Sequence, residues 1–241
     1  MTDEEFWQSV EATEEERIKG TYYLRERGLE EHFNVLRYLE SFRSSSDKRI
    51  TYSEIATVLR YDKRIRRCLF KYIGVVEERL RAHFLDFYRN SVSKVIPTKT
   101  YEKLLKIFNG DFYLAITHLM FGPFIQLFKK QEQMFKESVF GKIENLKTNL
   151  DALIALRNQV CHNKFLLNKL EFDVCKYIGE KKSSLYANIK NLYFFTDEDC
   201  KNGLIRDIKT CAFSRSAKYN NQVNWVLPKN VIVELDDLST N

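Results

Sequence analysis

The chain has 241 residues, long enough for one large domain or two small ones. With 44% hydrophobic and 14% aromatic residues, its composition is that of a globular protein and excludes a disordered one. Only eight glycines and three prolines interrupt the chain, which favours long helices over many short strands. The formal net charge is +6, and the absence of an apolar run of bilayer length argues against a membrane-spanning protein.

The cysteines and the N-terminus point to an intracellular protein. Five cysteines are scattered and form no C-x-x-C pair, which argues against a disulfide framework and against a zinc site. The first 16 residues are acidic and contain no apolar segment of the signal-peptide type. We therefore expect a cytoplasmic protein. The chain has no glycine-rich phosphate loop and no H-E-x-x-H motif, so we expect neither a cofactor nor a metal ion.

The first predicted helices lie before residue 44. Thr13 with Glu16 has the pattern of a capping box, which predicts a helix from there to about Gly28. Residues 30–43 carry apolar side chains at helical spacing and continue as a second helix. Residues 44–47 are small and polar, so we expect a loop there.

The clearest amphipathic segment runs from about Lys63 to Tyr88. A second capping box, formed by Thr51 with Glu54, opens a shorter helical stretch before it. Apolar residues recur along the segment at spacings of three and four, so we expect them to form the core face of a helix. These residues are Ile65, Leu69, Tyr72, Val76, Leu80, Phe84 and Phe87.

Glycine and proline divide the next part of the chain. Pro97 marks a break, and a short helix over residues 100–108 is expected to end at an Asn-Gly pair. A further helix is predicted over residues 111–120. We expect Gly122-Pro123 to break or kink this helix before the helical segment at residues 124–135.

The remaining predicted elements lie after residue 140. Residues 141–160 place their apolar side chains on one helical face, namely Ile143, Leu146, Leu150, Leu153, Leu156 and Val160. Helices are expected at about 184–195 and 197–211, with Thr196 as the cap of the second. Apolar residues alternate over 223–235, which predicts a short strand or an extended arm.

These elements predict an all-α fold. By sequence alone, the chain divides into an N-terminal helical region over residues 1–60 and a helical core over residues 61–180. A C-terminal helical extension, with the possible strand or arm, covers residues 181–241.

Basic residues are concentrated between residues 60 and 94, where ten basic side chains accompany four acidic ones. A basic helix of this kind suits a polyanion, and we expect that polyanion to be nucleic acid. The bases that lie off the apolar stripe are the candidates for binding RNA phosphates: Lys63, Arg64, Arg67, Lys71 and Arg81. The alternative is an ordinary solvated face of a charged helix.

The most informative motif is Arg157-Asn158-Gln159-Val160-Cys161-His162-Asn163. Arginine binds and neutralises a phosphate, and histidine has an ordinary pKa suited to proton transfer near neutral pH. Together they provide metal-free chemistry on RNA. The same spacing recurs at Arg27 and His32, but that copy spans a predicted helix end, and we interpret it as structural.

Helix geometry makes the motif more specific. At about 100° per residue, His162 lies opposite the apolar face centred on Leu153, and Asn158 lies one turn before it on the same outward side. Arg157 lies on the flank of the apolar face, about 140° from His162. One regular helix cannot aim both side chains at one phosphate. Either the helix is distorted near Cys161, or two copies complete the site across a two-fold axis; the second solution predicts a homodimer.

The motif resembles the R-x4-6-H motif of the HEPN superfamily, in which Asn commonly follows the arginine. The chain around it is similar to the Abi-like (AbiD/AbiF) branch of abortive-infection proteins. Three further elements, in the order of that family, resemble its motifs: Arg25-Glu26-Arg27-Gly28-Leu29, the pair Tyr61–Arg66 and Val76–Arg81, and Phe121-Gly122-Pro123-Phe124. The likeness covers about residues 20–168. Tyr61 and Ile65 depart from the usual Phe and Leu.

The resemblance implies an all-α HEPN-type bundle, a homodimer and metal-independent endoribonuclease activity in antiphage abortive infection or as a toxin. RNA would be the substrate, a regulatory small RNA, or both. The expected catalytic residues are Arg157, Asn158 and His162, with Asn163 supporting the loop. Two alternatives remain open: a catalytically inactive HEPN-fold module that binds RNA, such as a small noncoding RNA, and a purely structural helical adaptor.

Overall fold

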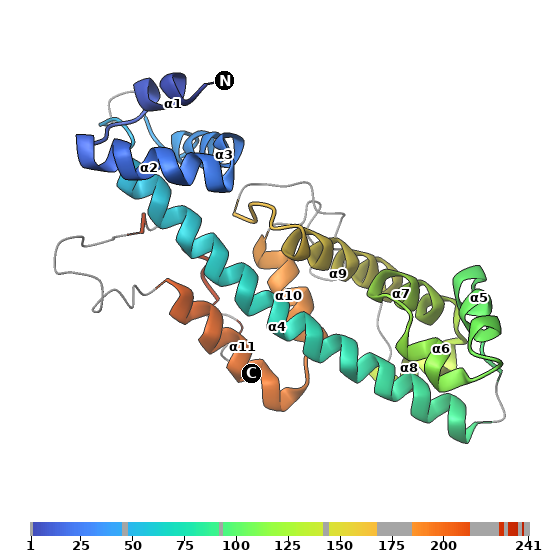
Figure 1. Ribbon diagram of the computed structural model, residues 1–241. Helices are drawn as coiled ribbons and strands as arrows, with labels where there is room; N and C mark the ends of the chain where they lie inside the picture. The colour runs from blue at the N-terminus through green and yellow to red at the C-terminus, as the bar shows by residue number, and fades with distance from the viewer. Residues whose placement is uncertain are drawn as a thin grey trace. The chain divides into compact units, whose positions relative to one another are not determined.

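The computed structural model describes residues 2–44, 48–91, 94–141, 145–167, 185–212, 227–228, 231–235 and 238. Within these ranges every regular element is an α-helix, and the prediction of an all-α fold is confirmed (Figure 1). The one β-type pairing among them joins Glu11 to Thr51. There the Glu11 amide donates to the Ile50 carbonyl oxygen at 2.8 Å.

The helices vary widely in length. The five longest are α2 (Glu14–Arg27), α3 (Leu29–Glu40), α4 (Tyr52–Asn90), α9 (Leu146–Cys161) and α11 (Glu198–Cys211). The shorter ones are α1 (Asp3–Ser9), α5 (Lys99–Ile107), α6 (Phe112–Thr117), α7 (Phe121–Lys130), α8 (Gln133–Phe140) and α10 (Leu185–Phe195). The two stretches predicted before and after residue 60 are a single helix, α4, which passes through that predicted domain boundary without a break.

The chain forms two compact units. The first comprises Met1–Cys68, Gln159–Leu170 and Asn202–Asn241, and the second comprises Leu69–Asn158 and Glu171–Lys201. Each unit is therefore assembled from separate segments of the sequence, whereas the divisions predicted at residues 60 and 180 follow the chain in order.

The first unit gathers α1, α2 and α3 at the N-terminal end of α4 (Figure 1). Both predicted capping boxes are present: the Thr13 hydroxyl accepts from the Glu16 amide, and the Thr51 hydroxyl accepts from the Glu54 amide. The ring of Phe6 is fully buried and packs edge-on against Phe33, with ring centroids 5.3 Å apart. These contacts fasten the short α1 to the rest of the unit.

Gly20 has a packing role in α2. A Cβ atom at this position would lie 2.4 Å from Cη2 of Trp7 and 2.8 Å from Cζ of Tyr52. Both rings are buried; Trp7 belongs to α1 and Tyr52 to α4, and their ring centroids lie 5.0 Å apart. Gly74 in α4 is different, because a Cβ there would meet no atom within 4 Å.

These two glycines predict opposite effects of the same substitution. Gly20→Ala is expected to lower the free energy of unfolding by about 1–3 kcal/mol, because overpacking outweighs the gain in helix propensity. Gly74→Ala is expected to raise it by about 0.5–1 kcal/mol, because only the propensity changes. Urea denaturation of the two variants measures both values. A stabilised Gly20→Ala protein would contradict the packing described for Trp7.

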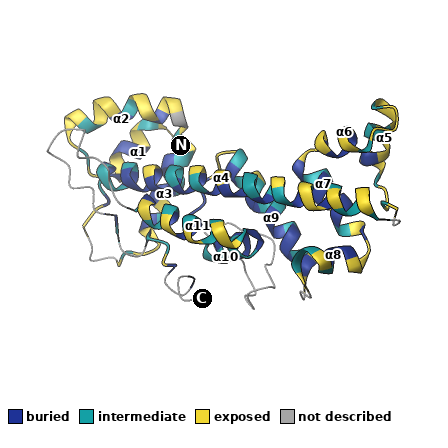
Figure 2. Cartoon of the chain, turned by 90° about the horizontal axis from the view of Figure 1, so that it is seen from below, coloured by how far each residue is buried: buried dark blue, intermediate teal, exposed yellow. Residues whose placement is uncertain are grey.

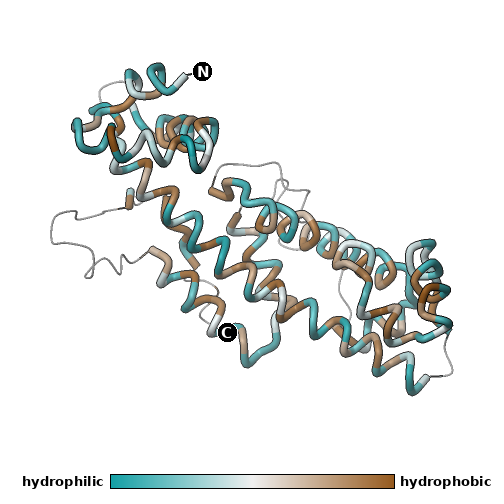
Figure 3. The backbone as a smooth tube through the Cα atoms, viewed as in Figure 1, coloured by the Kyte–Doolittle hydropathy of each residue, from teal (hydrophilic) through white to brown (hydrophobic). Residues whose placement is uncertain are grey.

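The second unit has an aromatic core around α4. Phe84 is fully buried and contacts Phe124 and Phe135, with ring centroids 5.7 and 5.4 Å away. Dark blue, buried stretches alternate with exposed ones along α4 in Figure 2, and brown and teal alternate along the same helix in Figure 3. The predicted stripe is confirmed, since all its members are buried except the half-buried Phe87.

The predicted break between two helices is present, but it lies at residues 118–120, before Gly122-Pro123. Both residues lie in the first turn of α7, which begins at Phe121 after the N-cap Met120. A proline is tolerated there because the first amides of a helix have no intrahelical acceptor. The helix before it, α6, ends at Thr117, and α7 ends at Lys130, so the segment predicted over residues 124–135 is divided between α7 and α8.

Thr196 does not cap α11 as expected. Its hydroxyl donates to the Leu192 carbonyl oxygen at 2.8 Å, which is a bond to the end of α10. The residue before α11 is Asp197, whose carbonyl oxygen accepts from the amides of Cys200 and Lys201. The Asp197 carboxylate forms an ion pair with Arg79 of α4 at 2.7 Å, and this tertiary contact selects Asp197 over Thr196.

The strand or arm predicted over residues 223–235 lies partly outside the described residues. In the part that is described, residues 227–228 and 231–235, the chain forms turns and no strand. The Val231 amide donates to the Pro228 carbonyl oxygen at 3.0 Å, and the Val233 amide donates to the Tyr61 hydroxyl at 3.0 Å. The alternation reflects side chains such as Leu235 that are buried in the first unit.

Candidate functional site

The apolar face of α9 orients the residues of the motif. Leu150 and Leu153 are fully buried, and Leu146, Leu156 and Val160 are nearly so, which confirms the predicted stripe. Ile143, the first residue predicted for it, lies outside the described residues. A helix anchored on this face presents its opposite face to solvent.

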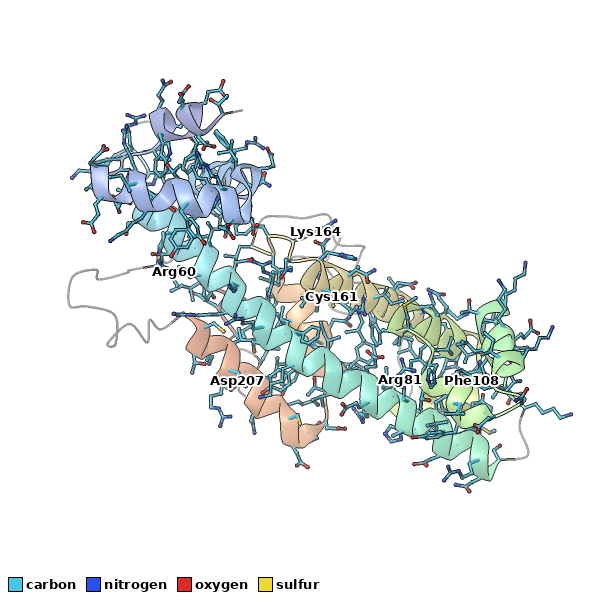
Figure 4. The ribbon with its side chains drawn as sticks, viewed as in Figure 1. Arg60, Arg81, Phe108, Cys161, Lys164 and Asp207 are labelled. Atoms are coloured by element: carbon cyan, nitrogen blue, oxygen red, sulfur yellow. The ribbon has the colours of Figure 1, made fainter. Side chains whose placement is uncertain are left out.

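The motif residues lie as the helix geometry predicts. Asn158 is exposed, Arg157 is half-buried, and His162 and Asn163 are exposed. The Arg157 guanidinium donates to Oδ1 of Asn158 at 3.4 Å, which joins the two neighbouring side chains near the end of α9. His162 follows the last helical residue, Cys161, so it stands at the C-cap position. Figure 4 labels Cys161 at the helix end and Lys164 in the segment beyond it.

A tight turn closes α9 directly after His162. The Asn163 amide donates to the Val160 carbonyl oxygen at 3.3 Å, and the Lys164 amide donates to the Gln159 carbonyl oxygen at 3.1 Å. Asn163 has a φ of 53°, in the left-handed region that favours glycine and asparagine. These two bonds and the left-handed residue constitute a Schellman motif. Asn163 therefore supports the turn, in agreement with the role suggested for it.

Two buried charged residues of α4 hold this turn. The Arg66 guanidinium donates to the Asn163 carbonyl oxygen. Its Nε lies 2.8 Å from Oδ2 of Asp62, as an ion pair whose two side chains are 10% and 0% exposed. Oδ1 of Asp62 accepts from the Leu166 amide at 2.7 Å, so the pair contacts the segment on both sides of Phe165.

The environment of Asp62 perturbs its titration. Burial raises the pKa of the Asp62 carboxyl to about 6, and the neighbouring Arg66 and the Leu166 amide partly oppose this effect. Glu31 lies 3.6 Å from the same guanidinium and also raises the pKa of Asp62. Arg66 and the Leu166 amide favour the ionised form of Asp62, and without them burial would raise its pKa further.

The predicted RNA-binding residues fall into three groups. Arg67 and Lys71 are exposed on α4. Lys63 and Arg64 are half-buried, and the Arg64 guanidinium lies 3.4 Å from the Cys211 carbonyl oxygen. Arg81 is only 14% exposed: it pairs with Glu77 and donates to the carbonyl oxygens of two residues near the end of α6, Ile116 and Leu119. Arg81 thus stabilises the second unit, and we leave it out of the proposed RNA-binding surface.

The histidine of the second arginine–histidine pair, His32, has a structural role, as expected. His32 is 1% exposed, and its Nδ1 lies 3.0 Å from the Gly28 carbonyl oxygen. The ring packs edge-on against Phe6, with centroids 5.8 Å apart. The motif at Arg157 and His162 has the same spacing, but its histidine is exposed to solvent.

Sequence reasoning missed the ion pair that supports the turn. In the sequence, Asp62 and Arg66 belong to the basic segment and to the Tyr61–Arg66 element, and neither pattern predicts that they pair with each other. One signal was available: both lie within the buried face of α4, next to Ile65 and Leu69. An acid and a base four residues apart on an apolar face predict an internal ion pair.

Comparisons of the chain with family models, with curated proteins and with solved structures find no match. Among the helices that the structure describes, none is long and apolar enough to cross a membrane. No cluster of three or more His, Cys, Asp or Glu residues suited to a metal ion occurs in the same part of the chain.

Proposed function

We propose that the protein is a metal-independent endoribonuclease that cuts RNA by attack of the 2′-hydroxyl on the adjacent phosphate. The observation that carries this proposal is the exposed His162 at the C-cap of α9, with the exposed Asn158 one turn earlier and Arg157 beside it. A general acid or base must reach its substrate, and a histidine fixed on a tight turn meets this need.

Each residue has a defined part in the proposed reaction. The 2′-hydroxyl is an internal nucleophile that RNA carries and DNA lacks. His162 transfers the proton from this hydroxyl or to the leaving 5′-oxygen. Arg157 stabilises the negative charge on the oxygen atoms of the crowded phosphorane. Asn158 orients the arginine, in keeping with the 3.4 Å bond between them. The products are a 2′,3′-cyclic phosphate and a 5′-hydroxyl.

The proposed active unit is a homodimer. Arg157 is half-buried on the flank of the apolar face of α9, whereas the exposed His162 stands beyond the last helical residue, Cys161. A two-fold axis would bring two Arg–Asn–His sets together and let the arginine of one copy serve the histidine of the other. Sedimentation of the wild-type protein at several concentrations gives the oligomeric state. A strictly monomeric protein that cuts RNA would remove this part of the proposal.

The biological role follows from the resemblance to Abi-like HEPN proteins. Under this proposal the protein is cytoplasmic and cuts RNA during phage infection or as a toxin, restrained until then by a small noncoding RNA or another partner. The test of the activity is incubation of the wild-type protein with a mixed RNA pool in EDTA, beside the His162→Ala variant. We expect the wild-type protein to cut the RNA and the His162→Ala variant not to cut it.

A second candidate function is a catalytically silent module that binds RNA. The exposed Arg67 and Lys71 on α4 favour it, because it needs a basic surface and no catalytic histidine. Under this alternative, binding persists in the His162→Ala variant and the wild-type protein cuts nothing.

Both functions predict that the surface formed by Arg67 and Lys71 contributes to RNA affinity, and that this contribution weakens as the salt concentration rises. The charge-removing double variant Arg67→Gln/Lys71→Gln is expected to bind single-stranded RNA more weakly and to reduce the slope of log K against log salt by about 1–1.5, since about 0.7 counterions are released per phosphate contact. Arg81→Gln is the control, because the Arg81 guanidinium bonds to carbonyl oxygens within its own unit and its loss should leave the slope unchanged. Fluorescence anisotropy at several salt concentrations measures the slope. An unaltered slope in the double variant would exclude this surface.

A further inference from the structure

We propose that Asp62 and Arg66 are positioning residues, which act as a polar clasp that fixes the turn carrying His162. This inference rests on the proposed function for its effect on catalysis, but the clasp itself is a statement about the structure. It consists of the Asp62–Arg66 ion pair and its bonds to the segment Asn163–Leu167.

The segment after α9 divides sharply by exposure. His162, Asn163 and Lys164 are exposed, whereas Phe165, Leu166 and Leu167 are 6%, 0% and 8% exposed. The ring of Phe165 packs edge-on against Tyr38 of α3, with centroids 5.5 Å apart. The exposed turn therefore lies between the end of α9 and the buried apolar residues 165–167.

The clasp contacts the segment on both sides of that division. Arg66 donates to the carbonyl oxygen of Asn163, the residue directly after His162. Asp62 accepts from the Leu166 amide at 2.7 Å and also from the Leu167 amide. The ion pair connects the Arg66 bond to Asn163 with the Asp62 bond to Leu166, so loss of either side chain affects both bonds.

Energetics indicate that the clasp serves geometry more than stability. Removing two charges from water is costly, and well-packed apolar residues of similar volume are often at least as stabilising. What apolar residues cannot do is bond to the Asn163 carbonyl oxygen and to the amides of Leu166 and Leu167. Those three backbone groups define the path of the chain through the His162 turn, which is the property that a catalytic histidine needs.

Arg79 provides a matched control in the same helix. Its guanidinium also forms an ion pair, with Asp197 at 2.7 Å, and also donates to a backbone carbonyl oxygen, that of Phe195 at 3.0 Å. These partners belong to the second unit, whereas the clasp and His162 belong to the first. Arg79→Lys therefore removes the same kind of interaction without touching the turn after α9.

The experiment compares Arg66→Lys, Asp62→Asn and Arg79→Lys with the wild-type protein. Lysine cannot reproduce the several donors of Arg66, and asparagine keeps an acceptor for the Leu166 amide but removes the charge that pairs with Arg66. Cleavage of a fluorescent RNA is measured for each protein at the same interval below its melting temperature. We expect kcat to fall about 10- to 100-fold in the two clasp variants with KM nearly unchanged, and to change less than about threefold in Arg79→Lys.

A second readout does not depend on catalysis. The chain has four histidines, and NMR of protein labelled in the histidine rings follows each one. The ring signal of His162 is expected to shift or broaden in both clasp variants, while the signals of His83 and His118 stay in place. Amide exchange of the wild-type protein adds a test that needs no variant: the Lys164 and Leu166 amides should be protected almost to the level of global unfolding.

The possible results separate the clasp from the proposed function. If the clasp variants lose no more kcat than Arg79→Lys, the positioning role is overturned. If the wild-type protein cuts no RNA, the proposed function fails, and the NMR and exchange measurements still decide the clasp. An unmoved His162 signal, or rapid exchange of the Lys164 and Leu166 amides in the wild-type protein, would then overturn it.

Discussion

A folded His162→Ala protein is expected to cut RNA about 10²- to 10⁴-fold more slowly than the wild-type protein while binding the same RNA with nearly unchanged affinity, because general acid–base catalysis contributes that much to a reaction. His162 is exposed at the end of α9, so its loss removes little packing. The expected change in stability is within about 0.5 kcal/mol. Single-turnover cleavage at saturating protein separates the chemical step from binding.

His83→Ala is the control for this experiment. His83 is another exposed histidine, on α4, and the proposed reaction assigns it no part. Its substitution should leave the rate of cleavage within about twofold of the wild-type rate, a change of about 0.4 kcal/mol in the barrier. Equal losses in the two variants would trace the effect to something other than proton transfer by His162. Full activity in His162→Ala would remove this residue from the mechanism.

The second large effect concerns the stability of the first unit. At pH 7, Arg66→Met is expected to lower the free energy of unfolding by about 3–5 kcal/mol, because it leaves the fully buried Asp62 without its main countercharge. The exposed Arg67 is the matched control, and Arg67→Met should change the stability by less than about 0.5 kcal/mol. Urea denaturation gives both values.

The loss in Arg66→Met should also depend on pH. In the wild-type protein the folded-state pKa of Asp62, about 6, lies above the ordinary value of 3.8. Between these values the folded protein binds more protons than the unfolded chain, so the contribution of Asp62 to stability rises as the pH falls through 6 towards 3.8. Without Arg66, which lowers this pKa, Asp62 protonates more readily in the folded state. The penalty of Arg66→Met should therefore shrink between pH 7 and pH 5.

An Asp62→Asn background isolates this effect. With no carboxyl at position 62, the cost of Arg66→Met should become nearly independent of pH over the same interval. A penalty in the wild-type background that is constant between pH 7 and pH 5 would contradict the assignment of the effect to Asp62. A penalty no greater than that of Arg67→Met would contradict the buried ion pair itself.

Features that depend on local periodicity were predictable from the sequence. The apolar faces of α4 and α9 follow from spacings of three and four, and the outward position of Asn158 follows from counting residues along α9. The capping boxes at Thr13 and Thr51 are local as well, since each joins residues three apart. These features need no knowledge of distant contacts.

The features that were missed depend on tertiary structure or on ambiguous signals. Proline opens a helix as readily as it breaks one, so Gly122-Pro123 alone could not define the start of α7. Thr196 and Asp197 are both good caps, and the ion pair of Asp197 with Arg79 decides between them. The bond from Asp62 to Leu166 joins residues 104 positions apart, which no local pattern encodes.

The clasp and the Schellman turn refine the interpretation of the motif. From the sequence, the alternatives were a distortion near Cys161 or a site completed by a second copy of the chain. The structure ends α9 at Cys161 and places Asn163 in the left-handed conformation, so His162 stands at a helix end and not within a regular helix. The histidine is thus held on a defined turn, while the proposal of a second copy remains as the source of the arginine.

The most direct test of the central claim is cleavage of a DNA oligonucleotide that contains a short RNA block, with and without 2′-deoxy substitution at the mapped cleavage site, in the presence of EDTA. The proposed mechanism predicts cutting only where a 2′-hydroxyl is present, with a 2′,3′-cyclic phosphate and a 5′-hydroxyl at the new ends. Cleavage at the 2′-deoxy position, a 5′-phosphate at the cut, or loss of activity in EDTA would contradict it.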